Sequence, residues 1–332
     1  MKSTVLVTGG AGFMGAHLAE ELIKLGYKTV VLDDLSGGFE ENVPNKAVFV
    51  KGSILNFKLI RELFKKYKFD YVFHLGAYAA EGLSHFIRIF NYRNNLLGSI
   101  NLINESIRYN VKCFVFTSSI AVYGTNQLPM KEETTPQPED PYGISKYAVE
   151  LDLKSAYEMF GLNYIIFRPH NVYGEKQNLG DKYRNVVGIF MNQIMQNKPL
   201  TIFGEGKQTR AFSYIGDVAP IIAKSIKIKK AYNQVFNIGA DKPYTVNYLA
   251  ETVKKAMSSN QKTKHLPARN EVVHAYSSHN KVKKVLGYKT KFSLEEGVQR
   301  MADWAKKIGS KKSKKFKNIE LTKNLPPSWV EK

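Results

Sequence analysis

The first 33 residues run through an apolar strand, a glycine-rich turn, a helix and a second strand, and this order constrains the fold more than any other feature. Residues 4–8 are apolar and β-branched, as a buried parallel strand should be. Gly9, Gly12 and Gly15 follow as Gly-x-x-Gly-x-x-Gly, a variant of the dinucleotide fingerprint. Glycines permit a tight turn and let backbone N–H groups approach a pyrophosphate at a helix start. The sequence therefore predicts an α/β domain that binds a dinucleotide, with a glycine turn in an unrelated α/β protein as the alternative.

The second predicted strand, residues 28–33, ends in an acid suited to a ribose. Asp33 follows Gly15 at close to the separation of about 20 residues that is expected for a ribose-binding carboxylate. A carboxylate there accepts hydrogen bonds from the 2′- and 3′-hydroxyls and repels a 2′-phosphate. We therefore expect NAD rather than NADP as the cofactor.

Tyr142 and Lys146 form a Tyr-x-x-x-Lys pair at the start of a predicted helix. Asp140 and Pro141 precede the pair as an N-cap acid and a first-turn proline, so positions i and i+4 share one helical face. A lysine near the phenol, helped by a cationic nicotinamide, lowers the tyrosine pKa and makes the phenolate a usable base. Ser119, after an apolar strand, can hydrogen-bond the reacting oxygen. The alternative is a surface tyrosine beside a serine-rich strand end.

Several motifs occur in a fixed order along the chain. They are TGGAGFMG (8–15), DDLS (33–36), HLGAYAAEG (74–82), NN (94–95), TSSIAVYG (117–124), PYGISK (141–146), RPHNVYG (168–174) and GKQTRAFSYIGDVA (206–219). With this set the chain resembles the extended short-chain dehydrogenase/reductase superfamily, and within it the NAD-dependent nucleotide-sugar epimerases. The resemblance covers roughly residues 3–305.

Strands and helices alternate through the first half, which predicts an α/β fold with a doubly wound parallel Rossmann sheet. Strands are predicted near 28–33, 47–50, 70–75, 112–118 and 162–168, and helices near 55–67, 88–109, 141–160, 185–197, 217–229, 246–257, 279–286 and 293–307. We expect an NAD-binding Rossmann domain over residues 1–170 that also receives residues near 217–240. A smaller, interleaved C-terminal substrate-binding lobe should cover 171–310, followed by a basic tail over 311–332.

The resemblance implies site residues position by position. The implied catalytic residues are Ser119, Tyr142 and Lys146. The implied cofactor-binding residues are Gly9, Gly12, Phe13, Met14, Gly15, Asp33, Asp34, Ser36, Gly37, Ser53, Ile54, Leu75, Gly76, Ala77, Asn95, Tyr142, Lys146 and His170. The implied substrate-binding residues are Ser119, Tyr142, Asn171, Arg184, Asn185, Arg210 and Arg269. Relatives usually carry aspartate in place of Ser53 and a large aromatic in place of His170, for which a packed histidine is the alternative. For the three arginines the alternative is a solvated side chain.

Comparison with the relatives also excludes some reactions of this superfamily. Dehydratases of this group carry Asp-Glu where this chain has Ile120 and Ala121, and the decarboxylases place a glutamate at the second of these positions. C4 epimerisation needs only the catalytic trio and a tightly held NAD, with hydride leaving and returning at C4 through a transient 4-keto sugar. We therefore expect a UDP-hexose 4-epimerase of the UDP-glucose/UDP-galactose type. Arg184, beside a substrate asparagine, together with the hydroxyls of residues 117–119, leaves UDP-glucuronate as the alternative substrate.

The formal charge of +20, from 49 basic and 29 acidic residues, is also compatible with a different class of protein. The lysine-rich run 306–317 could contact nucleic acid or anionic lipid, so a non-catalytic NAD-binding or RNA-binding protein is the alternative. We favour a solvated basic surface, and the intact catalytic trio argues against nucleic acid as a partner. No apolar run has transmembrane length, the N-terminus has no signal peptide, and the single cysteine, Cys113, excludes an internal disulfide. We expect a cytoplasmic enzyme without a metal site, and a homodimer because relatives pair through the helix that carries Tyr142.

Overall fold

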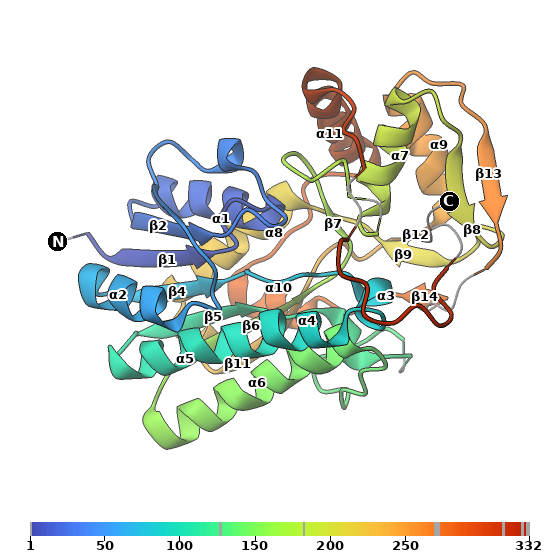
Figure 1. The fold of residues 1–332 in the computed structure, drawn as a ribbon. Coiled ribbons are helices and arrows are strands. Elements are labelled where there is room, and N and C mark those ends of the chain that lie inside the picture. The colour runs from blue at the N-terminus through green and yellow to red at the C-terminus, as the bar shows by residue number, and fades with distance from the viewer. Residues whose placement is uncertain are drawn as a thin grey trace.

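A seven-stranded, entirely parallel sheet forms the centre of the protein (Figure 1). The computed structural model describes residues 2–125, 128–181, 183–268, 273–313, 316–326 and 329. The strand order is β11-β6-β5-β4-β1-β2-β3. Its strands are β1 (Thr4–Thr8), β2 (Lys28–Asp33), β3 (Val48–Lys51), β4 (Tyr71–His74), β5 (Cys113–Thr117), β6 (Tyr164–Pro169) and β11 (Gln234–Ile238). This order confirms the predicted doubly wound sheet, whose switch point lies between β1 and β4.

Helices cover both faces of the sheet because its strands are apolar on both sides (Figure 1). Val5 and Val7 belong to the core beneath α1 (Phe13–Lys24) and α8 (Ile215–Lys224). Leu6 points to the opposite face, toward a core that contains residues of α2 (Phe57–Tyr67), α5 (Gly98–Arg108) and α6 (Pro141–Phe160). Alternate residues of one strand therefore serve two separate cores.

The helix predicted over 88–109 is present, but it consists of two α-helical segments joined by a π-helical turn. It comprises α4 (Arg88–Tyr92), a π-helical turn (Arg93–Leu97) and α5. A π-helical turn inside an α-helix is frequent at functional sites. Here it carries Asn94 and Asn95, the two asparagines of the sequence motif.

The smaller lobe is built around three helices and short sheets, and it lies beside the carboxyl ends of the central strands (Figure 1). Its helices are α7 (Val186–Met195), α9 (Val246–Ala256) and α11 (Leu294–Ile308), and its strands are β8 (Leu200–Phe203) with β13 (Thr263–Leu266), and β9 (Thr209–Ala211) with β12 (Pro243–Thr245) and β14 (His274–Ala275). The remaining elements are β7 (Val172–Tyr173) paired with β10 (Ser213–Tyr214), the short helix α3 (Glu81–Ser84) and α10 (Asn280–Leu286). The lobe is interleaved with the sheet, since β11 pairs with β6 at the sheet edge.

Most of the described residues of the C-terminal tail are exposed, as expected, but a few of its side chains pack against the Rossmann domain. Trp329 is only 8% exposed and belongs to a core cluster with Leu83 and Ile87 of the Rossmann domain. Phe316 packs against the same cluster. Isolated aromatic residues in a lysine-rich run gave no periodic pattern, so their burial could not be predicted. Separately, no helix in the described part of the chain is long and apolar enough to cross a bilayer.

Candidate active site

A cavity of about 1410 Å³ lies between the carboxyl ends of the central strands and the smaller lobe. A pocket for one ligand usually measures roughly 300–1,000 Å³, so this cavity has room for a cofactor and a substrate together. The predicted residues that line it are Gly9, Gly12, Phe13, Met14, Gly15, Asp33, Asp34, Ser36, Gly37, Ile54, Leu75, Gly76, Ala77, Ser119, Tyr142, Lys146, His170, Asn171, Arg184, Asn185 and Arg210. Ser53 and Asn95 are not among the lining residues, and Arg269 lies outside the described residues.

The glycine turn forms a cradle that side chains would fill. Gly9 has a positive φ of 69°, and a Cβ there would lie 2.7 Å from the backbone nitrogen of Gly76. A Cβ on Gly15 would lie 2.1 Å from the carbonyl oxygen of Gly9. Gly12 is the N-cap of α1 and offers no side-chain hydrogen bond to the first turn. The turn thus meets the requirements of a pyrophosphate at a helix N-terminus.

Asp33 joins the end of β2 to this cradle. Its carboxylate accepts hydrogen bonds from the backbone N–H groups of Ala11, at 3.0 Å, and Leu35, at 2.8 Å. Burial raises the pKa of Asp33, although these two amides oppose the shift. The carboxylate lines the cavity next to the glycine turn, so the residues present fit the ribose and pyrophosphate of NAD.

The buried side chain of His74, at the end of β4, contacts both β1 and α5. Nδ1 of His74 lies 2.7 Å from Thr8 Oγ1, and its Nε2 lies 2.8 Å from Ser99 Oγ. Because Ser99 donates its own proton to the carbonyl of Asn95, it must accept from Nε2–H of His74. Burial, assisted by the charge of Lys146, lowers the pKa of His74 to about 3, which keeps the ring neutral. The chain of bonds fixes the ends of the strands that line the cofactor half of the cavity.

The side chain of Asn95 hydrogen-bonds to the backbone of Tyr78, in the segment after β4. Its Oδ1 accepts from the N–H of Tyr78 at 2.8 Å, and its Nδ2 donates to the carbonyl of Tyr78 at 3.1 Å and to Asn91 Oδ1 at 2.8 Å. This clamp holds the segment after β4 over the cavity. The prediction of Asn95 as a supporting residue therefore has a geometric basis, although Asn95 is not a lining residue.

Tyr142 lies in the first turn of α6, as predicted from the capping residues. Asp140 is the N-cap and accepts from the N–H of Gly143 at 3.0 Å, and Pro141 begins the helix. Ser119 precedes a 3₁₀ turn and accepts from the N–H of Ala121 at 3.1 Å. Burial raises the pKa of Tyr142 above its ordinary value, while its hydrogen bond with Ser119 opposes this shift. The lowering of this pKa by Lys146 together with a cationic nicotinamide therefore remains a prediction.

Lys146 lies one turn further along α6, fully buried beneath the cavity. Its Nζ donates to the carbonyl oxygen of Thr117 at 2.7 Å and lies 4.7 Å from the ring centre of Phe116 and 5.9 Å from that of Tyr142. Burial lowers its pKa to about 7, although Glu150 opposes the shift. The ammonium group is therefore held at a fixed point between strand β5 and the phenol.

The substrate half of the cavity carries two asparagines in the left-handed region of the backbone. Asn171 has φ 41° and Asn185, the N-cap of α7, has φ 66°. Asparagine tolerates this conformation better than most residues, and such positions cluster at functional sites. Both line the cavity together with the first turn of α7, and Arg210 lines it from β9, donating from Nη1 to the carbonyls of Thr209 and Val273 at 2.9 Å each. Amides and cations are thus available to a diphosphate.

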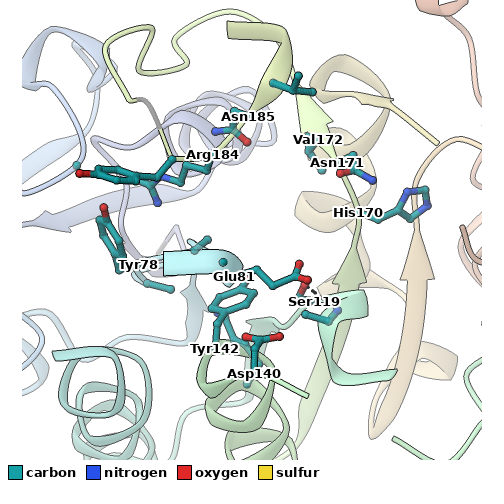
Figure 2. A pocket seen from close by; sticks show the side chains of 18 of the residues that line it. Tyr78, Glu81, Ser119, Asp140, Tyr142, His170, Asn171, Val172, Arg184 and Asn185 are labelled. Carbon is teal, nitrogen blue, oxygen red and sulfur yellow. Dashed lines mark hydrogen bonds between the residues drawn. The ribbon is translucent and has the colours of Figure 1, made fainter. Parts of the chain in front are cut away.

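Arg184 lines the cavity and extends toward Tyr78 (Figure 2). Its Nε donates to Asp181 at 2.5 Å, and its guanidinium carbon lies 4.6 Å from the ring centre of Tyr78. A Cβ on Gly37 would lie 3.2 Å from one of its terminal nitrogens. The side chain is therefore no solvated arginine, and its charge is near enough to Tyr142 to oppose the rise in the pKa of that tyrosine.

His170 lines the cavity, but its ring nitrogens bond elsewhere. Nδ1 lies 3.0 Å from the carbonyl oxygen of Ala211, and Nε2 lies 2.9 Å from Nε2 of His279. The two rings stack with their centres 5.1 Å apart. A role of His170 in cofactor binding remains a prediction, and it is restricted to packing because both nitrogens have protein partners.

One acid near the catalytic pair, Glu81, was not assigned from the sequence. Glu81, at the start of α3, lines the cavity and extends its carboxylate toward Ser119 and Tyr142 (Figure 2). Its charge raises the pKa of Tyr142, after the larger effects of burial and of the charge of Asp140. The signal was its place within the motif of residues 74–82, which follows a strand end at the sheet edge where ligands bind. Among the described residues no group of three or more His, Cys, Asp or Glu side chains is arranged to hold a metal ion.

Comparison with known proteins agrees with this geometry. Residues 5–239 match the NAD dependent epimerase/dehydratase family. A putative UDP-glucose 4-epimerase of Methanocaldococcus jannaschii is 35% identical over 308 residues, covering 91% of this chain and 98% of that protein.

Two solved structures share the fold. The UDP-glucose 4-epimerase of Thermotoga maritima with UDP-glucose superposes with a TM-score of 0.88 at 35% identity, covering 92% of this chain and 99% of that one. The UDP-glucuronic acid 4-epimerase of Bacillus cereus, in complex with UDP-glucuronic acid and NAD, does so with a TM-score of 0.85 at 26% identity, covering 92% and 99%. The family match, the relative's identity and the dinucleotide cradle lead to one conclusion: this chain belongs to the NAD dependent epimerase/dehydratase family, and NAD is its cofactor.

Proposed function

We propose that this protein is a UDP-hexose 4-epimerase of the UDP-glucose/UDP-galactose type. The observation that carries the proposal is that one cavity joins the dinucleotide cradle to Ser119 and Tyr142, while Ile120 and Ala121, the lining residues that follow Ser119, bear no ionisable group. Removal of water across C5 and C6 needs an acid and a base besides the tyrosine. Epimerisation at C4 needs a single group that takes a proton from one oxygen and returns it.

The chain's own residues would perform the proton chemistry. NAD, when bound, supplies the hydride acceptor and donor, with its pyrophosphate on the amides at the start of α1 and its ribose at Asp33. Tyr142 would accept the proton of the sugar 4-hydroxyl, while Ser119 Oγ holds that oxygen. The ammonium group of Lys146 would favour the phenolate by charge attraction. After the 4-keto sugar turns its other face toward the cofactor, Tyr142 returns the proton to the same oxygen.

Asn171, Asn185 and Arg210 are proposed to hold the diphosphate and the sugar at the far end of the cavity. The similarity to an epimerase whose structure contains UDP-glucose supports this assignment. The direct test is incubation of the NAD-loaded protein with UDP-glucose or UDP-galactose, followed by separation of the two epimers. Interconversion supports the proposal, and a protein that binds both sugar nucleotides without interconverting them opposes it.

UDP-glucuronate is the second candidate substrate, and Arg184 is the observation that favours it. Its guanidinium is largely enclosed, with a side-chain exposure of 19%, and it lines the cavity near Tyr142. A cation at this place could pair with a uronate carboxylate, as the similarity to a UDP-glucuronic acid 4-epimerase also suggests. The Arg184→Ala variant would lose uronate turnover selectively if this is correct. Equal losses with UDP-glucose and UDP-glucuronate would rule the assignment out.

The expected homodimer is also a proposal, and α6 gives it a surface. Leu151, Met159 and Phe160 on this helix are 47%, 72% and 64% exposed, whereas Leu153 and Ala156 are core residues. Pairing of two α6 helices would cover the exposed side chains. Sedimentation of the wild-type protein and of Leu151→Arg would test this: a dimer that the substitution dissociates supports the pairing, and a wild-type monomer excludes it.

A further inference from the structure

The C-terminal segment lines the cavity and contacts both the smaller lobe and the Rossmann domain. Residues 316–326 and Trp329 are called the C-terminal strap here. In Figure 1 the dark red segment that follows α11 runs down to α3. The strap residues that line the cavity are Leu321, Lys323, Asn324, Pro326 and Trp329. The strap lies beyond residues 3–305, over which the sequence resembles the epimerases.

Glu320 anchors the strap to the Rossmann domain. Its two carboxylate oxygens accept from the backbone N–H groups of Ile89 and Phe90, each at 2.8 Å. The backbone N–H groups of Glu320 and Leu321 both donate to the carbonyl oxygen of Phe86, at 2.8 and 3.2 Å. A carboxylate at the first turn of α4 also complements the positive end of the helix dipole. These bonds hold the strap to the segment that follows α3.

Aromatic contacts attach the strap on both sides of the cavity. The ring of Phe316 lies 5.2 Å from that of Tyr78, in the Rossmann domain. The indole of Trp329 lies edge-on to Phe86 at 6.2 Å and to Tyr183, of the smaller lobe, at 5.2 Å. The backbone N–H of Phe316 also donates to the hydroxyl of Tyr183 at 3.2 Å. The strap therefore bridges the two lobes through packed rings rather than through its lysines.

The C-terminal strap lies next to the end of the cavity where the sugar would react. A Cβ on Gly82 would lie 3.5 Å from Cη2 of Trp329. Gly82 adjoins Glu81, whose carboxylate extends toward Ser119 and Tyr142 (Figure 2). Trp329 thus packs on the short helix that brings an acid to the catalytic pair.

We propose that the C-terminal strap is the outer wall of the sugar subsite and determines which nucleotide sugars the enzyme accepts. The inference rests on the proposed function, since it takes the ligand to be a UDP-sugar. A wall fixed at Glu320 and Trp329 leaves less room for a bulky substituent on the hexose, such as an N-acetyl group. Lys323 adds a positive charge at the rim, which favours an anionic sugar nucleotide.

Three altered chains test the wall: one that ends at Ser313, Trp329→Ala and Lys323→Ala. Lys317→Ala is the matched control, because Lys317 is exposed and is not a lining residue. Each protein is loaded with NAD, and the Kd values of UDP-glucose and UDP-N-acetylglucosamine are measured by calorimetry. In the shortened chain and in Trp329→Ala, the Kd of UDP-N-acetylglucosamine relative to that of UDP-glucose should fall about fivefold or more. Lys323→Ala should weaken both ligands about threefold, and Lys317→Ala should change neither.

An unchanged Kd ratio in a folded shortened chain would overturn the proposal. If the shortened chain does not fold, unchanged binding in both Trp329→Ala and Lys323→Ala would overturn it instead. Because the readout is binding, it is separate from the proposed reaction. A full-length protein that binds UDP-glucose without epimerising it refutes the proposed function, while the ratio of the two Kd values still decides the role of the strap.

Discussion

Nε2 of His170 lies 2.9 Å from Nε2 of His279, and the two buried imidazoles stack with their ring centres 5.1 Å apart. Nδ1 of His170 faces the carbonyl of Ala211 and Nδ1 of His279 faces a carboxylate oxygen of Asp241, at 3.0 and 2.8 Å. Both outer nitrogens therefore carry protons, since a carbonyl and a carboxylate oxygen can only accept. Burial, with the neighbouring His279, lowers the pKa of His170 to about 3, which keeps this ring neutral at neutral pH.

Asp241→Asn should destabilise the protein in a pH-dependent way. The hydrogen bond from His279, followed by that from Lys283, lowers the pKa of Asp241 from 3.8 to about 2. A lowered carboxyl pKa stabilises the fold above pH 3.8, and the contribution disappears as the pH falls toward 2. Since the side chain is 52% exposed, the loss at neutral pH should be about 1 kcal/mol. Urea unfolding of this variant and of Asp303→Asn, an exposed control, measures it, and a difference that stays constant with pH would contradict the assignment.

Tyr142→Phe should abolish epimerisation while leaving the cofactor site intact. Loss of the proton-transfer group should lower kcat by about 10²–10⁴-fold. The Kd for NAD and the melting temperature should change little, because the ring that packs in the first turn of α6 remains. Tyr157→Phe on the exposed side of the same helix is the control, and it should keep full activity. Comparable activity in the two variants would remove Tyr142 from the chemistry.

Lys146→Met should remove the pH dependence of folding stability that the buried lysine causes. The pKa of Lys146 is lowered from 10.5 to about 7 by burial. Between these values the unfolded chain binds more protons than the folded one, so the wild-type stability should rise with pH through this window. Relative to the methionine variant, the wild type should gain about 1 kcal/mol or more from pH 7 to pH 10. Lys154→Met on the same helix should show no such trend, and a flat difference for Lys146→Met would contradict the burial effect.

Asp33→Asn should weaken the preference for NAD over NADP. The neutral amide no longer repels a 2′-phosphate, and it accepts only one of the two hydrogen bonds from Ala11 and Leu35. The ratio of the Kd values for NADP and NAD should fall by about tenfold, equivalent to about 1.4 kcal/mol. Fluorescence titration with both cofactors measures the ratio. An unchanged ratio would mean that another residue excludes the phosphate.

Local signals predicted the first half of the fold well. Asp140 and Pro141 define the start of α6 by their own backbone chemistry, and apolar runs such as Thr4–Thr8 define the central strands. The lobe was predicted less completely, because strands as short as Val172–Tyr173 carry no periodic pattern. The strap could not be predicted at all. The partners of Glu320 lie 231 and 230 residues earlier in the chain, and nothing local to a lysine-rich segment indicates them.

For the catalytic pair, too, the sequence predicted the local geometry but not the effect of distant residues. The spacing of Tyr142 and Lys146 predicted that they share a helical face, and α6 contains both. The pKa of the tyrosine depends on how deeply the fold buries it and on charges such as Glu81, which no spacing reveals. A sequence motif therefore identifies the residues, whereas the environment decides their proton affinity.

The most direct test of the central claim is a turnover assay with the purified, NAD-loaded protein. UDP-glucose is supplied without any external oxidant or reductant, and UDP-glucose and UDP-galactose are separated at intervals. We expect an approach to a mixture of the two epimers from either side, with no net consumption of NAD. Tight binding of UDP-glucose with no galactose epimer formed, or a product that has lost water or carbon dioxide, would contradict it.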